Sequence, residues 1–156
     1  MSLVNLAHVC SHIQNCSRNR VPLAAVSMTR LHLQVCAGLY KEGFLSSIQR
    51  GDANKPDETF IPATPQNIAT RKLWLGLKYD GFNPVLSKLR LISKPSHKFV
   101  LDEYQLRDLA VGKEVRKISP LAPGEAIFVK INNDDVVEIR EAVAKRLGGQ
   151  LLCRAS

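Results

Sequence analysis

The sequence lacks the patterns that identify most enzymes, disulfide-bonded domains and membrane proteins. It contains no G-x-S-x-G, no glycine-rich phosphate-binding loop and no H-E-x-x-H. Its four cysteines form no C-x-x-C pair, which favours a reducing intracellular compartment over a disulfide framework. No apolar run approaches the roughly 18 residues of a membrane-spanning helix. These absences predict a soluble, non-enzymatic protein with no cofactor, no small-molecule substrate and no membrane partner.

Acidic residues are missing from the start of the chain, where the first one is Glu42. Leu3, Leu6, Val9 and Ile13 recur at helical spacing within this acid-free, serine-containing stretch, which predicts an amphipathic helix. Such a segment is typical of an organelle transit signal, and it can equally be the first structural helix of a domain. We therefore expect a protein of the mitochondrial matrix whose import signal is retained.

Positive charge is in excess, and it is unevenly distributed. The 156 residues carry a formal net charge of +8. Residues 1–50 contribute +4 and residues 71–130 contribute +6, whereas residues 51–70 contribute −2 and the remainder is neutral. Two basic regions on either side of an acidic, proline-containing insert favour a polyanionic partner.

The periodicity of apolar residues predicts an α+β fold with two domains. The amino-terminal domain (1–80) is expected to contain two helices, three strands and a loop insert at 50–70. The carboxy-terminal domain (81–156) is expected to be mostly β, with one helix. Strands are expected at 23–28, 44–48, 72–79, 85–93, 97–101, 126–131 and 151–153. Helices are expected from residue 3 to shortly after 13, at 31–42 before Gly43, and in a short stretch at 102–109 capped by Asp102. The pattern Asp135-x-x-Glu138 predicts a capping box for the last helix, with Val136, Ile139, Val143 and Leu147 buried, and Asp134-Asp135 are interpreted as helix caps.

One helical pattern includes potential zinc ligands. His8, His12 and Cys16 have the i, i+4, i+8 spacing of ligands on one helix face. A fourth ligand is missing, and the polar residues around Cys16 predict that the helix ends before it. No metal ligand is therefore predicted.

The placement of basic residues favours binding of folded RNA. Thr29 and Arg30 occupy a predicted strand-to-helix turn, where a hydroxyl, a guanidinium and the helix amino terminus can hold phosphate. Aromatic residues make up only 6% of the chain, which disfavours base stacking on single strands. Further basic residues follow one predicted strand and its end (Lys88, Arg90, Lys94, His97, Lys98), and three lie in a predicted loop (Lys113, Arg116, Lys117).

Several short motifs occur in a consistent order along nearly the whole chain. They are Ile13-Gln14-Asn15, Val26-Ser27-Met28, Lys41-Glu42-Gly43-Phe44-Leu45, Leu73-Trp74-Leu75-Gly76-Leu77-Lys78-Tyr79, Ser93-Lys94-Pro95 and Leu147-Gly148-Gly149-Gln150-Leu151-Leu152-Cys153. In these motifs the chain resembles the universal small-subunit ribosomal protein eight family. The resemblance implies a structural constituent of the small ribosomal subunit that binds the central domain of small-subunit rRNA, contacts neighbouring ribosomal proteins and supports assembly and translation.

The resemblance also carries the predicted RNA contacts. The family's strongest contact is a Ser-Thr-Ser-x-Gly loop, which is replaced here by Asn132 and Asn133 followed by two aspartates that would repel phosphate. This change, the insert at 50–70 and the acid-free start suggest a mitochondrial member. The expected contacts are Arg30, Lys94, Lys98 and Lys130 to phosphate, Asn15, Thr29, Asn132 and Asn133 to sugar or base edges, and Lys88, Arg90 and His97 along the strand. Two alternatives remain open: a free RNA-binding assembly factor or regulator that leaves the mature subunit, and an RNA-processing enzyme.

Overall fold

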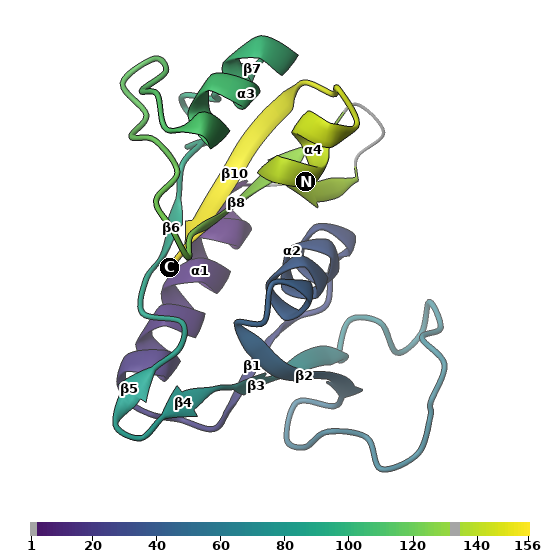
Figure 1. Ribbon diagram of the computed structural model, residues 1–156. Coiled ribbons are helices and arrows are strands. Elements are labelled where there is room, and N and C mark those ends of the chain that lie inside the picture. Colours follow the sequence, from purple (N-terminus) through teal and green to yellow (C-terminus); the bar gives the residue numbers. More distant parts are fainter. Residues whose placement is uncertain (1–2, 132–134) are drawn as a thin grey trace.

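The computed structural model describes residues 3–131 and 135–156, in which two long helices lie between two antiparallel sheets (Figure 1). The first part of the chain contains α1 (Leu3–Arg18), β1 (Leu23–Ser27), α2 (Arg30–Lys41), β2 (Leu45–Gly51), β3 (Lys72–Leu77), β4 (Tyr79–Asp80) and β5 (Asn83–Pro84). The second part contains β6 (Leu89–Leu91), β7 (Val100–Leu101), α3 (Glu103–Val111), β8 (Ala126–Lys130), β9 (Val136–Glu138), α4 (Ile139–Ala144) and β10 (Gly149–Ala155). The predicted α+β class is confirmed, and the second part carries two short helices.

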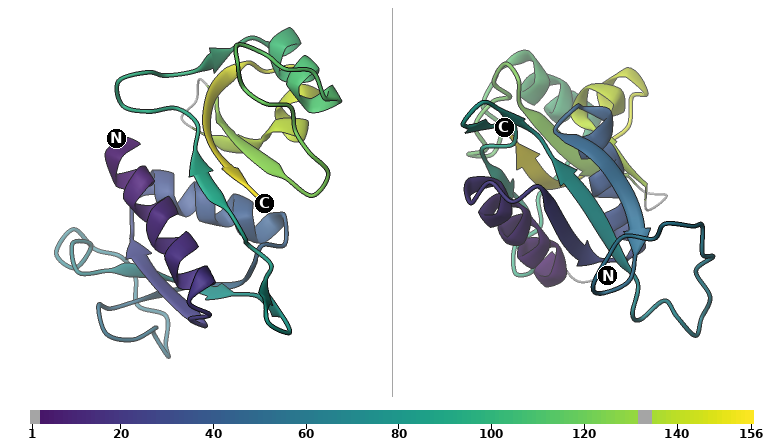
Figure 2. Two further views of the ribbon diagram at one scale, coloured as in Figure 1. Left: turned by 90° about the vertical axis from the view of Figure 1, so that its left-hand side faces the viewer. Right: turned by 90° about the horizontal axis from the view of Figure 1, so that it is seen from below.

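The two sheets face each other across α1 and α2. The smaller sheet has the order β1-β3-β2, and the larger has the order β6-β10-β8-β9 with β7 also paired to β10. Figure 2 shows the helices between these layers, while α3 and α4 lie on the far side of the larger sheet. One core cluster draws residues from both helices and both sheets, and a second is confined to residues 101–151. The first cluster therefore crosses the predicted boundary at residue 80, and the division into two domains stays a prediction.

The amphipathic pattern of α1 is confirmed, although the helix is longer than expected. Leu6, Ile13 and their neighbours at helical spacing are buried. The helix continues to Arg18, because Ser17 is buried and its hydroxyl donates to the carbonyl oxygen of Leu86 at 2.6 Å. The prediction that the helix ends before Cys16 was wrong. None of the helices in the described ranges combines the length and apolar character needed to cross a lipid bilayer.

The central strand of the smaller sheet follows the predicted alternation. Leu73 and Leu75 are fully buried, as a strand with one face on the core requires. The insert begins at the end of β2 and returns at Arg71, whose guanidinium is almost fully buried. Nη1 of Arg71 donates to both carboxylate oxygens of Asp57 (2.7 and 2.8 Å) and to Asp52 at 3.1 Å. The insert has little regular structure, but this buried ion pair fixes its base.

The predicted start of the last helix at Asp135-x-x-Glu138 was wrong, since α4 begins at Ile139. Val136–Glu138 forms the edge strand β9, in which Val137 pairs with Val129 and Glu138 with Phe128. Two β-branched valines beside an available strand favour this pairing over a helix turn. Glu138 then caps the shorter helix α4, accepting from the backbone N–H of Arg140 at 2.7 Å. Within the predicted buried stripe Ile139 is buried, Val136 and Val143 are half-buried, and Leu147 is exposed.

Other elements differ from expectation mainly in length. The strand predicted at 85–93 is reduced to Leu89–Leu91, and the strand predicted at 97–101 to Val100–Leu101. The last strand extends over seven residues because it pairs with β6, β7 and β8. The helix start at Asp102 is confirmed, with Gln105 completing a capping box. Gly43, at φ +85°, follows α2 as the predicted stop.

A close approach joins α2 to the larger sheet. A Cβ atom added at Gly38 would lie 2.5 Å from Cε1 of Phe128, and Phe128 is fully buried. The aromatic ring of β8 therefore occupies the space that any side chain at this helix position would need. The absence of a side chain at Gly38 sets the distance between α2 and β8.

We predict that Gly38→Ala lowers the free energy of unfolding by about 2 kcal/mol, because overpacking against Phe128 outweighs the gain of about 1 kcal/mol in helix propensity. Equilibrium denaturation followed by circular dichroism measures the change. The matched control is Ala37→Gly at the exposed neighbouring position, which should lose about 1 kcal/mol through propensity alone. A stabilised Gly38→Ala protein would show that α2 and β8 are not in this contact.

We also predict that Arg71→Met lowers the free energy of unfolding by about 3 kcal/mol, because the largely buried Asp57 loses its counter-charge. Fluorescence of Trp74 measures this unfolding, since its indole N–H donates to the carbonyl oxygen of Asp52 in the same insert. Lys55→Met removes an ion pair in which both partners are exposed and should change stability by less than about 0.5 kcal/mol. Equal effects of the two substitutions would contradict a structural role for the buried pair.

Candidate nucleic-acid interface

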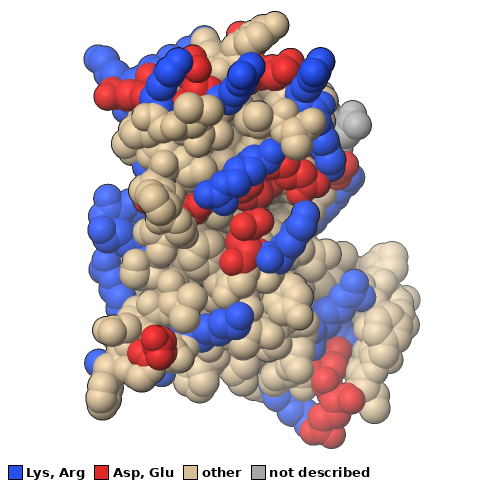
Figure 3. Space-filling view, viewed as in Figure 1, with Lys and Arg blue, Asp and Glu red and all other residues tan. Residues whose placement is uncertain are grey.

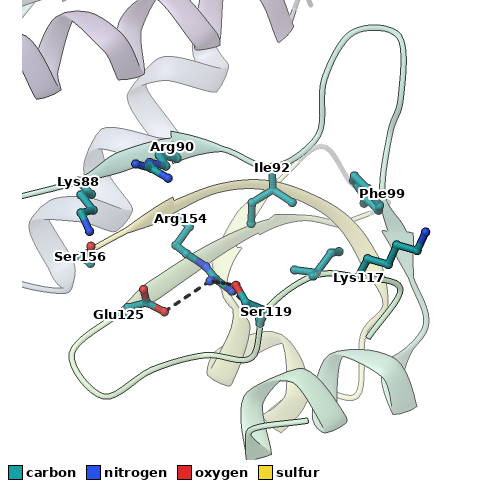
Figure 4. A pocket seen from close by; sticks show the side chains of 10 residues that line it. Lys88, Arg90, Ile92, Phe99, Lys117, Ser119, Glu125, Arg154 and Ser156 are labelled. Atoms are coloured by element: carbon teal, nitrogen blue, oxygen red, sulfur yellow. Dashed lines mark hydrogen bonds and ion pairs between the residues drawn. The ribbon is translucent and has the colours of Figure 1, made fainter. Parts of the chain in front are cut away.

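A basic groove of about 410 Å³ lies beside β6, and we call it the β6 groove (Figure 4). Figure 4 shows Lys88, Arg90 and Ser156 at one end, Phe99 and Lys117 at the other, and Arg154 between them. The ten lining residues are Lys88, Arg90, Ile92, Phe99, Lys117, Ile118, Ser119, Glu125, Arg154 and Ser156. Four cations around one carboxylate give the groove a net positive charge.

Strand pairing brings these cations together. β6 is an edge strand that pairs with β10, and Arg90 stands directly opposite Arg154 in the register. Arg154 is held in place because its guanidinium donates to the hydroxyl of Ser119 at 2.6 Å and lies 3.8 Å from a carboxylate oxygen of Glu125. Within the described residues no hydrogen bond or ion pair engages the side chains of Lys88, Arg90 or Lys117. The groove thus combines one fixed cation with three that are available to a ligand.

A second hollow of about 520 Å³ continues from the β6 groove towards α1. Arg90 lines both spaces, and Asn15 and Gln14 line the second from the side of the helix. The amide oxygen of Gln14 accepts from the backbone N–H of Leu89 at 3.0 Å, which joins α1 to β6. Asn15, which was predicted as a contact apart from the strand residues Lys88 and Arg90, therefore lies with them along one continuous surface.

A second basic group surrounds a smaller hollow of about 240 Å³. Lys98 and Lys130 line it, together with Leu31 at the start of α2. Lys94 and His97 lie in the adjoining turn, where their backbones exchange hydrogen bonds of 2.9 and 3.0 Å. The buried Ser93 fixes this turn by accepting from the backbone N–H of Phe99 at 3.0 Å. The family-like Ser-Lys-Pro sequence thus builds a turn that exposes its cations.

Thr29 and Arg30 occupy the predicted strand-to-helix turn, but both already have partners. The hydroxyl oxygen of Thr29 accepts from the backbone N–H of His32 at 3.2 Å and caps α2. Nη2 of Arg30 lies 3.4 Å from Oδ1 of Asp135, with both side chains more than half exposed. Asp135 therefore pairs with Arg30 and does not cap a helix, contrary to the prediction. An exposed pair of this kind is weak enough to open to a phosphate.

Asn132 and Asn133 lie outside the described residues. The remaining predicted contacts separate into the β6 side (Asn15, Lys88, Arg90) and the α2 side (Thr29, Arg30, Lys94, His97, Lys98, Lys130). The sequence-based prediction missed Arg154 and Ser119. A lone arginine within an apolar final strand was a signal for Arg154, since its neighbours Cys153 and Ala155 are buried.

The structure shows where two of the three potential zinc ligands, His12 and Cys16, lie. Cys16 Sγ lies 3.7 Å from Nε2 of His12 along the extended helix. Burial raises the pKa of the Cys16 thiol, which disfavours the thiolate that a metal needs. Among the residues that the structure describes, no group of three or more potential ligands is placed to hold a metal ion.

Figure 3 shows that the margin beside β6 and the front of the molecule differ in charge. Lysine and arginine side chains follow the margin on the side of β6, while the front of the molecule mixes acidic and basic side chains between α2 and α4 (Figure 3). The basic margin is suited to a polyanion, and the mixed front is not.

Comparison with known proteins shows the family of the chain. The family model described as Ribosomal protein S8 matches residues 5–155. The chain is similar to the small ribosomal subunit protein uS8m of Schizosaccharomyces pombe, with 44% identity covering 97% of this chain and 99% of that protein. It is also similar to uS8m of Neurospora crassa, with 38% identity over 99% of each chain. Its identity to uS8 of Prochlorococcus marinus strain NATL2A is 25%, over 95% of this chain and 93% of that protein. The chain therefore belongs to the ribosomal protein S8 family.

Proposed function

We propose that this protein holds folded small-subunit rRNA through the β6 groove and the basic group beside α2. The observation that carries this proposal is the gathering of Lys88, Arg90, Lys117 and Arg154 around one groove from three separate segments of the chain. Asn15 extends the surface with an amide that can reach sugar or base edges. The rRNA segment proposed from the family resemblance is the central domain, and the proposed role includes subunit assembly.

The protein is a structural, non-enzymatic component of the ribosome. Membership of the family and the high coverage of both uS8m relatives support this role. Because these relatives are mitochondrial small-subunit proteins, the predicted location in the mitochondrial ribosome of the matrix is confirmed. Neighbouring small-subunit proteins are proposed as further partners.

The groove supports recognition of the RNA backbone. Phosphate groups are neutralised by exposed lysine and arginine side chains, and release of condensed counterions then drives binding. Ile92, Phe99 and Ile118 form an apolar wall, against which a sugar can lie. The fixed guanidinium of Arg154 gives the groove one preorganised position, which reduces the conformational entropy lost on binding.

We predict that Lys88→Gln with Arg90→Gln weakens binding to a transcript of the central domain of mitochondrial small-subunit rRNA. The plot of log K against log salt concentration has a negative slope, and its magnitude should decrease by about 2, because each lost phosphate contact reduces it by about 0.9. Filter binding between 50 and 200 mM salt measures the slope. The matched control, Lys55→Gln with Lys113→Gln, removes two exposed charges outside the groove. An equal fall in the control would show that only net charge matters.

We further predict that the tagged protein cosediments with the small subunit when mitochondrial lysate is fractionated at moderate salt. The Lys88→Gln, Arg90→Gln variant should shift towards the top of the gradient, since part of its RNA contact is lost. A wild-type protein found only in precursor particles would instead support the alternative of an assembly factor that leaves the mature subunit.

A further inference from the structure

A second groove, of about 260 Å³, lies between α2 and the edge strand β9, and we call it the α2–β9 groove. Its apolar part is formed by Ala37 from the helix and by Val136 and Val137 from the strand. Figure 3 shows acidic and basic side chains meeting in this region, between α2 and α4. None of the residues that line it was predicted as an RNA contact.

The groove is acidic although the protein is basic. Three carboxylates line it, those of Glu42, Glu138 and Glu141, against the single cation Lys41. Nζ of Lys41 already lies 2.8 Å from Glu141, and Lys145 donates to the same carboxylate at 2.6 Å. These two hydrogen bonds lower the pKa of Glu141 to about 2, so it is ionised and paired near neutral pH. Among the described residues Glu42 has no ion pair, and Glu138 has only the 3.7 Å contact with Arg140, so these two carboxylates determine what the groove accepts.

Glu138 provides an independent indication of a missing partner. Its side chain is only 7% exposed, and one carboxylate oxygen accepts from the backbone N–H of Arg140. The other oxygen, Oε1, has no hydrogen-bond partner among the described residues, and its nearest cation is Arg140 Nη1 at 3.7 Å. A buried acceptor without a donor is costly. A ligand with N–H groups would supply what is missing.

On the α2 side of the groove, Gln34 also has a buried oxygen to which no described residue donates a hydrogen bond. Its Nε2 donates to Asp135 at 3.1 Å, but its Oε1 is buried and has no donor within the described part of the chain. The terminal torsions of Gln and Glu are soft, so small rotations can turn both oxygens towards a ligand. The groove is therefore lined by two residues that each have an acceptor unsatisfied by the described residues, and by more carboxylates than cations.

These properties restrict the occupant. RNA is disfavoured because its phosphates would face carboxylates. A drug-sized small molecule is disfavoured because about 260 Å³ is below the roughly 300–1,000 Å³ of such sites. One long side chain fits the volume, and a guanidinium offers several N–H donors in a planar fork that matches a carboxylate.

We propose that the α2–β9 groove receives an arginine side chain from a segment of a neighbouring protein, with Glu138 and Glu42 as its carboxylate partners. The proposal rests on the proposed function, because it assumes that the protein has protein neighbours in the small subunit. The apolar surface of Ala37, Val136 and Val137 contacts the stem of the arginine, and Gln34 accepts from its backbone or its guanidinium.

Photo-crosslinking within purified small subunits tests the proposal. A photo-reactive residue replaces Tyr40, an exposed residue of α2 that follows Ala37 by one turn and does not line the groove, so that the groove itself stays open. We expect crosslinks to one protein, in a peptide whose attachment point lies within about five residues of an arginine. The crosslink yield should fall at least fivefold when Glu42→Gln or Glu138→Gln is added. Because Glu138 also caps α4, Glu42→Gln is the variant that leaves the fold intact, and Glu114→Gln is the matched control at an exposed acid elsewhere.

Each outcome is decisive. Crosslinks to RNA, no crosslink in subunits that contain the protein, or a yield unchanged by Glu42→Gln would overturn the proposal and leave the ribosomal function intact. A fall in yield of the same size in Glu114→Gln would also overturn it, since the groove would then have no special role. Failure of the otherwise wild-type protein to cosediment with the subunit would refute the ribosomal function and the proposal together.

Discussion

The structure depends on the burial of α1 and α2 on two sides at once, against the smaller sheet and against the larger one. A helix between two sheets must be apolar over a wide arc, and it must approach both closely enough to exclude water. Gly38 meets this condition for α2, since the Phe128 ring fills the space of a side chain. Gln14 joins α1 to the larger sheet, since its amide oxygen accepts from the backbone N–H of Leu89 in β6 at 3.0 Å. These contacts fix the position of the larger sheet relative to both helices.

That position gives the two edges of the larger sheet different surroundings. The edge strand β6 runs beside α1 and brings Arg90, with Lys88 directly before the strand, to a basic groove. The edge strand β9 faces α2 and contributes Glu138 to an acidic one. Exposed sheet edges invite unwanted pairing, and charged side chains or covering elements prevent it. Here the protecting charges have opposite sign at the two edges. The same devices that protect the sheet can therefore distinguish an RNA partner from a protein partner.

The sequence was informative wherever a pattern is local. The alternation of Leu73 and Leu75, the helix stop at Gly43 and the cap at Asp102 each depend on a few adjacent residues, and the structure has all three. The capping-box interpretation of Asp135-x-x-Glu138 failed because pairing with β8, which is not visible in the local pattern, decided between helix and strand. Arg154 was missed for a related reason: its place opposite Arg90 follows from the register of β10 with β6, and β10 contains a bulge between Leu151 and Cys153.

Net charge alone would describe this molecule poorly, because much of its charge is internally compensated. Arg71 forms ion pairs with two of the insert's carboxylates, and Glu141 engages both Lys41 and Lys145. Less fully compensated are an exposed basic surface on one side and, on the other, the largely buried carboxylate of Glu138, which lies 3.7 Å from the guanidinium of Arg140. Exposed charges are screened within about 8 Å at physiological ionic strength, and buried ones are screened much less. Contacts with RNA at the β6 groove should therefore weaken with salt, whereas an arginine held in the α2–β9 groove should persist. A protein bound through both surfaces would stay in place under conditions that loosen either contact alone.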